Sequence, residues 1–224
     1  MQKKEIESLL AKGREYIQGG NITKAIECFE QTVSIAPDSI DARLTLGAAY
    51  QIMDFFDRAK EQFEEIISFD PLNREAHSFL AKCLLGKRFQ EEMKIKNIGE
   101  FIGEEAQELY RQVEEHSARA IELGDTDSST FLTHVLALAY LGKGEELYQE
   151  SIKHCRDWDN KTKIYLSDKV SNLGILYGGG LKDEPMMARW YLLAAYELNP
   201  NDPRMKKLYE EFGLSDMLLE NEFY

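Results

Sequence analysis

The chain repeats itself with a period of 34 residues, and this period constrains its fold more than any other feature. Five landmarks of one unit return in the next, each 34 positions later: Gly13 as Gly47, Tyr16 as Tyr50, Ala25 as Ala59, Phe29 as Phe63 and Pro37 as Pro71. A fixed period of roughly 20 to 50 residues is typical of stacked structural repeats. The two ends of the unit keep the same spacing, so the repeat spans a whole unit.

Within one unit, apolar residues follow a helical period twice, with a break between the two runs. In the second unit the first run is Leu44, Leu46, Ala49 and Tyr50, and the second is Ala59, Phe63, Ile66 and Ile67, with the break near Asp54. This spacing predicts two helices with one apolar face each. The small residues Gly47 and Ala59 allow the helices to approach closely. Pro71 ends the second helix, because proline lacks the amide proton and disfavours a helical residue before it.

These residues resemble the signature of the tetratricopeptide repeat (TPR) family. The matching positions are Leu46, Gly47, Tyr50, Ala59, Phe63 and Pro71. The resemblance implies an all-α fold: a right-handed superhelical α-solenoid of about five helix-turn-helix units, closed by a C-terminal capping helix. It also implies that residues 1–224 form a single solenoid domain.

The later units follow the pattern less closely. The expected units lie near residues 6–39, 40–73, 74–127, 128–160 and 165–201, with the cap at 203–224. The third unit carries an insertion near residues 87–103, which departs from the family pattern. Two interpretations are open, an extra helix or a break that divides the chain into two sub-arrays. We expect the extra helix, because Met93, Ile95 and Ile98 need burial.

Composition excludes several classes of function. Lys and Arg number 27 against 40 Asp and Glu, so the net charge is −13 and the chain repels phosphate backbones and anionic membranes. No apolar run reaches the length of a membrane span, and the N-terminus lacks the apolar segment of a signal peptide. Three widely spaced cysteines, Cys28, Cys83 and Cys155, fit a reducing compartment. We therefore expect a cytoplasmic protein without nucleic-acid or membrane partners.

Residue patterns that carry catalysis or hold metals are scarce. The run Gly178–Gly180 lacks the spacing and the lysine of a phosphate loop, and it follows a helix instead of a strand. Neither His154 with Cys155 nor His77 with Cys83 has the spacing of a zinc site. Acidic pairs are numerous, as expected for solvated helix faces. We predict no catalytic residue, no metal and no cofactor, and hence a protein that is not an enzyme.

The TPR resemblance implies a binding groove lined by the first helix of each unit. The expected groove residues are Glu7, Leu10, Arg14 and Ile17 in unit one; Asp41, Leu44, Ala48 and Gln51 in unit two; Glu75, Ser78, Lys82 and Leu85 in unit three; Phe131, His134, Leu138 and Leu141 in unit four; and Asp168, Ser171 and Ile175 in unit five. For Leu138 and Leu141, packing between helices is an equally good interpretation.

Glu7, Asp41 and Glu75 recur one unit apart, and this acidic row suits either a basic ligand or plain solvation. Repeats of this family that hold chaperone tails use a clamp of basic and amide side chains. The matching positions here are Leu10, Arg14, Thr45, Glu75 and Phe79. Only Arg14 has a suitable charge, which disfavours that ligand.

The favoured function is a non-catalytic adaptor or scaffold that binds a protein or peptide segment in the groove. The expected segment has apolar anchors and some positive charge. The main alternative is an assembly or secretion-type chaperone that shields an apolar segment of its partner. An enzyme built on a helical solenoid is the least favoured interpretation, and self-association through residues 87–103 stays open.

Overall fold

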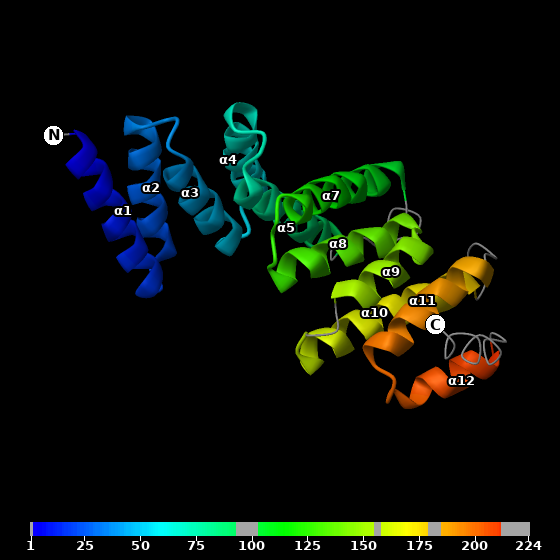
Figure 1. The fold of residues 1–224 in the computed structure, drawn as a ribbon. Helices are drawn as coiled ribbons and strands as arrows, with labels where there is room; N and C mark the ends of the chain where they lie inside the picture. The colour runs from blue at the N-terminus through cyan, green and yellow to red at the C-terminus, as the bar shows by residue number, and fades with distance from the viewer. Residues whose placement is uncertain (1, 93–102, 155–157, 179–184, 212–224) are drawn as a thin grey trace. The chain divides into compact units, whose positions relative to one another are not determined.

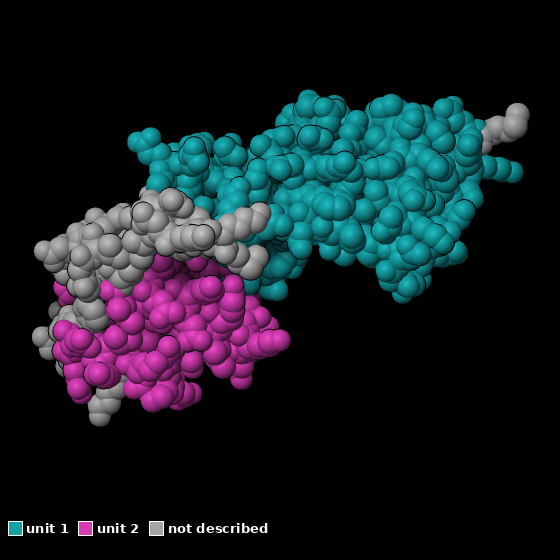
Figure 2. All heavy atoms as spheres, turned by 180° about the vertical axis from the view of Figure 1, so that it is seen from behind, with its two compact units in different colours: residues 1–133 teal, residues 134–224 magenta. Residues whose placement is uncertain are grey.

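The computed structural model describes residues 2–92, 103–154, 158–178 and 185–211 (Figure 1). Every regular element in these ranges is an α-helix, so the predicted all-α class is confirmed. None of the described helices is long and apolar enough to cross a membrane. The chain divides into two compact units, residues 1–133 and 134–224 (Figure 2). Each unit is described by itself below, and the single domain expected from the sequence stays a prediction.

The first compact unit is built from helical hairpins. Its helices are α1 (Gln2–Gln18), α2 (Ile22–Ile35), α3 (Ile40–Ile52), α4 (Phe56–Phe69), α5 (Arg74–Glu92) and α7 (Glu104–Glu122). Helix α1 packs on α2, α3 on α4, and α5 on α7, while α2 contacts α3 and α4 contacts α5. Each hairpin therefore stacks on the next one along the chain, as Figure 1 shows for the blue and cyan helices.

Short polar side chains start two of these helices. The Asn21 side chain accepts a hydrogen bond from the backbone N–H of Lys24, at 3.3 Å, at the beginning of α2. Ser39 does the same for Ala42, at 3.4 Å, at the beginning of α3. Such caps satisfy backbone donors that the first helical turn leaves unpaired. Local sequence thus marks where α2 and α3 begin.

The third hairpin differs from the first two because its first helix is longer. Helix α5 continues six residues beyond Gly86, into the segment predicted as an insertion. Arg88 in this extension is buried and lies over the ring of Tyr110 on α7, with its guanidinium carbon 5.7 Å from the ring centre. The insertion therefore begins as a continuation of α5. The extra helix predicted around Met93, Ile95 and Ile98 lies outside the described residues.

The second compact unit also consists of packed helices. It takes in most of α8 (Ser128–Leu141), with α9 (Gly144–His154), α10 (Asn160–Gly178), α11 (Pro185–Leu198) and α12 (Pro203–Glu211). Helix α11 contacts α9, α10 and α12. Tyr191 on α11 is fully buried and donates its hydroxyl to the carbonyl of Ala139. Met205 on α12 is also buried, so α12 covers this core as the predicted cap should; the rest of the predicted cap lies outside the described residues.

Candidate functional site

The first helices of the three hairpins in residues 1–133 lie side by side along one face. Arg14 on α1 places its Nη2 atom 2.7 and 2.8 Å from the two carboxylate oxygens of Asp41 on α3. Gln51 on α3 donates from Nε2 to the backbone carbonyl of Phe79 on α5, at 3.3 Å. We call the surface formed by α1, α3 and α5 the first-helix face. Three of the four bonded residues, Arg14, Asp41 and Gln51, are positions predicted to line a groove.

Apolar side chains are partly exposed along this face. Ile17 is three residues beyond Arg14, and Leu44 is three beyond Asp41, so each shares a helix face with the ion-paired residue. Both are half-buried, as is Phe79. The Phe79 ring stacks on Phe63, with ring centres 5.5 Å apart. The face thus combines partly exposed apolar surface with polar groups that already pair with one another.

The start of α8 is bonded to α5 at the edge of this face. Lys82 Nζ lies 2.8 Å from Asp127 Oδ2. Burial alone would raise the pKa of Asp127, but hydrogen bonds from Lys82 and Ser129 outweigh it and hold that pKa at about 2. The hydroxyls of Ser78 and Thr130 are 2.8 Å apart and buried. These bonds fix the beginning of α8 against the third hairpin.

The predicted groove residues differ in how much surface they offer. The exposed ones are Glu7, Arg14, Asp41, Glu75 and Ile175; the half-buried ones are Ile17, Leu44, Ala48, Gln51, Lys82, Phe131, Leu141 and Asp168; the buried ones are Leu10, Ser78, Leu85, His134, Leu138 and Ser171. Buried members support the surface and offer little area to a ligand. Asp41 and Asp168 are ion-paired, to Arg14 and Arg204 respectively.

Unit membership separates the predicted groove residues into two groups. Residues up to Phe131 belong to the first compact unit and those from His134 onward to the second. Leu138 is 1% exposed, which agrees with packing between helices. The structure brings the residues of α1, α3 and α5 together. Ligand binding by any of them stays a prediction.

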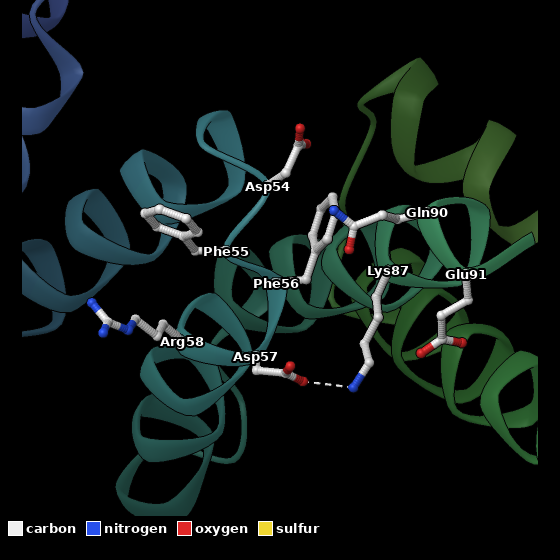
Figure 3. A pocket seen from close by; sticks show the side chains of 8 residues that line it. All are labelled: Asp54, Phe55, Phe56, Asp57, Arg58, Lys87, Gln90 and Glu91. Carbon is white, nitrogen blue, oxygen red and sulfur yellow. Dashed lines mark hydrogen bonds and ion pairs between the residues drawn. The ribbon is translucent and has the colours of Figure 1, made fainter. Parts of the chain in front are cut away.

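A hollow that sequence reasoning missed lies beside the α3–α4 turn, with a volume of about 460 Å³ (Figure 3). The turn and the start of α4 form one side of it, and the end of α5 forms the other. The lining residues are Asp54, Phe55, Phe56, Asp57, Arg58, Lys87, Gln90 and Glu91. Asp57 and Lys87 form an ion pair across it, at 2.5 Å. The signal in the sequence was Phe55, an aromatic residue where the preceding unit has the capping residue Asn21.

A second hollow, of about 640 Å³, lies between α4, α5 and α7 and contains two histidines. The Nδ1 atoms of His77 and His116 are 3.0 Å apart, and His77 Nε2 lies 3.1 Å from the carbonyl oxygen of Pro71. A carbonyl only accepts, so we assign the proton of His77 to Nε2 and the shared proton to Nδ1 of His116. Burial and the neighbouring His77 lower the pKa of His116. The pair joins α5 to α7.

Metal ligation and thiol chemistry find little support in the described ranges. No group of three or more His, Cys, Asp or Glu side chains there is arranged to hold a metal ion. Cys28 and Cys83 are buried thiols, and burial raises the pKa of Cys83 to about 12. A thiol with such a pKa stays protonated near neutral pH and is a poor nucleophile. Cys155 lies outside the described residues.

Sequence comparison matches residues 13–53, which cover the end of α1 and the whole of α2 and α3, to the family model of the TPR repeat. This chain carries a TPR repeat in residues 13–53. Three solved structures resemble it over most of its length. They are a thermophilic TPR protein in Thermus thermophilus, the protein YrrB, described as a TPR protein with an unusual peptide-binding site, and PilW, described as a widely conserved type IV pilus biogenesis factor.

The likeness of this chain to those structures is one of fold. The Thermus protein has 16% identity and a TM-score of 0.57, with 93% of this chain and 99% of that one covered. YrrB has 15% identity and a TM-score of 0.61, with coverages of 94% and 98%. PilW has 14% identity and a TM-score of 0.58, with coverages of 96% and 89%. Comparison with curated protein sequences gives no match.

Proposed function

We propose that this TPR protein is a non-catalytic scaffold that binds a segment of a partner protein on its first-helix face. One observation carries the proposal. The Arg14–Asp41 and Gln51–Phe79 bonds hold α1, α3 and α5 side by side, while Leu44 on α3 stays partly exposed. A preformed surface with apolar area and fixed polar groups suits an extended or helical segment.

The charges on this face favour a basic segment with apolar anchors. The two cations among the predicted groove residues, Arg14 and Lys82, are each already bonded to a carboxylate. Glu7 and Glu75 are exposed, and the structure records no ion pair to either of them among the described residues. The net charge of −13 attracts cationic partners over longer distances. Lysine or arginine side chains beside aliphatic ones would complement this surface.

The test is a comparison of captured partners between two variants that each gain one negative charge. Leu44→Glu places the charge on the first-helix face, and Gln31→Glu places it on the exposed surface of α2. Purified full-length chains are incubated with extract from the source cells, and circular dichroism checks that both variants keep the helical content of the unmodified chain. We expect Leu44→Glu to lose specific partners that Gln31→Glu retains.

Retention of every partner by folded Leu44→Glu would overturn the proposal. A partner captured only before it joins its own assembly would instead favour the chaperone alternative. In that case the first-helix face is still the binding surface, but the protein acts as a chaperone instead of a scaffold.

A further inference from the structure

The α1–α2 and α3–α4 turns have the same backbone. The N–H of Asn21 donates to the carbonyl of Tyr16 at 2.8 Å, and the N–H of Phe55, 34 residues later, donates to the carbonyl of Tyr50 at 2.9 Å. Each turn also contains one residue in the left-handed region: φ is +74° at Gly20 and +58° in the second turn. The first turn therefore serves as an internal reference for the second.

At two positions the second turn carries a residue that suits this backbone less well. Asp54 stands where the first turn has Gly20, and it is the one residue other than glycine with positive φ in the described ranges. Glycine adopts that conformation without steric cost, whereas other residues are strained there. Phe55 stands where the first turn has Asn21, and α4 consequently has no side-chain cap. The α3–α4 turn is therefore less stable than it would be with the glycine and asparagine of the α1–α2 turn.

The second turn also exposes apolar side chains. Ile52 is 57% exposed, Met53 37% and Phe55 46%. Tyr50 and Arg58 lie next to the Phe55 ring. The ring centres of Tyr50 and Phe55 are 6.4 Å apart, and the Arg58 guanidinium carbon is 5.9 Å from the centre of the Phe55 ring. Folding therefore leaves much of the apolar area of this turn in water. A strained residue, a missing cap and exposed apolar side chains together lower stability, and such features are typical of functional surfaces.

The hollow beside this turn has an excess of negative charge (Figure 3). Its carboxylates are Asp54, Asp57 and Glu91, against the cations Arg58 and Lys87. Lys87 neutralises Asp57 across the hollow. Asp54 has no recorded ion pair in the described part of the chain and points away from the other lining side chains in Figure 3. A cationic group on a ligand would complement this rim.

We propose that residues 52–55, together with this hollow, form a second docking surface, which takes a partner segment carrying lysine or arginine beside aliphatic side chains. The exposed apolar residues would pack on the aliphatic part, and Asp54 would pair with the cation. This surface lies on the α3–α4 turn and the end of α5. It shares no residue with the contacts that tie the first-helix face together, and it does not depend on the function proposed for that face.

The stability arm of the test exchanges residues between the two turns. Asp54→Gly removes the strain at positive φ and is expected to raise the midpoint of thermal unfolding by roughly 2 °C. The mirror variant, Gly20→Asp, introduces the same strain in the first turn and is expected to lower it. If Asp54→Gly left the midpoint unchanged or lower, the strained turn would carry no stability cost and the proposal would be overturned.

The binding arm uses a fluorescein-labelled heptapeptide of alternating lysine and leucine, with the glutamate–leucine heptapeptide as its charge control. All chains in this arm carry Leu44→Gln, which removes the exposed apolar side chain of the first-helix face without adding a charge that would attract the basic peptide. Fluorescence anisotropy should show binding of the basic peptide only. Phe55→Asn is expected to weaken it about tenfold, the loss of one apolar anchor, whereas the mirror variant Asn21→Phe leaves it unchanged.

Three results of the binding arm would overturn the proposal. They are no binding of the basic peptide in the Leu44→Gln chain, equal binding by Phe55→Asn, and tighter binding of the acidic peptide. Because Leu44→Gln is present throughout, these results do not depend on whether the first-helix face binds a partner.

Discussion

Gly47 lies directly against the ring of Phe63. A Cβ atom added to Gly47 would be 2.5 Å from Cε1 of that ring, closer than real Cβ contacts allow. The same relationship joins Gly13 to Phe29, where the distance would be 2.3 Å. Both rings are buried, at 0% and 1% exposure. The repeated glycine and phenylalanine are therefore one packing feature that sets how closely the two helices of a hairpin approach.

Gly47→Ala should destabilise the chain by about 1–3 kcal/mol, because the added methyl group forces the buried Phe63 ring or the α3 backbone to move. Urea unfolding followed by far-UV circular dichroism would measure the change. The control is Gly19→Ala, in an exposed turn where the nearest atom to an added Cβ is the carbonyl oxygen of Glu15, at 3.4 Å. A Gly47→Ala effect no larger than that of Gly19→Ala would contradict the packing argument.

The Arg14–Asp41 ion pair should contribute little to stability, although its geometry is good. Its side chains are 53% and 56% exposed, so water and salt screen the attraction. A double-mutant cycle with Arg14→Ala and Asp41→Ala should give a coupling energy of about 0–1 kcal/mol, smaller at high salt. A larger coupling that persists at high salt would mean that the pair is better shielded than its exposure indicates.

Lys82→Glu should destabilise the start of α8, which makes it unsuitable as a pure test of ligand binding. It replaces the partner of Asp127 with a second carboxylate, and the pKa of Asp127, now about 2, should rise. Lys82→Gln removes the charge without adding repulsion and should destabilise less. NMR titration of the Asp127 carboxyl carbon in each variant would measure the shift. An unchanged pKa in Lys82→Glu would show that Ser129 alone holds it low.

Stability of the third hairpin should fall as the pH drops below about 6.5. The pKa of His116 is lowered from its ordinary value of 6.5 by burial and by His77, while Glu64 and Glu115 oppose this shift and Lys60 adds to it. Below 6.5 the unfolded chain binds the proton more readily than the folded one, so the free energy of unfolding decreases until the pH passes the lowered pKa. Denaturant unfolding between pH 8 and 5 would measure this slope.

The matched variant for this pH dependence is His116→Gln. Its amide N–H can still donate to Nδ1 of His77, and its side chain does not titrate. We expect a shallower loss of stability between pH 6.5 and 5 than in the unmodified chain. An identical slope in both chains would assign the pH dependence to other groups.

Sequence alone predicted the helical class, the break near Asp54 between the two helices of the second repeat and the residues that pack within each hairpin. These features are local, because a run of apolar residues at helical spacing, a capping residue and a proline each act over one or two turns. The prediction was weaker in the third repeat. Nothing in the residues after Gly86 signals a helix end, and α5 indeed continues to Glu92.

Only the tertiary structure decided which side chains meet between hairpins. Arg14 finds Asp41 across 27 positions and His77 finds His116 across 39, with other helices intervening in the chain. Those contacts depend on the rotation and stacking of whole helices, which no local pattern encodes. The exposure of Phe55 is a similar case, because the 34-residue period gave its position in a turn and packing alone determined how much of its ring stays in contact with water.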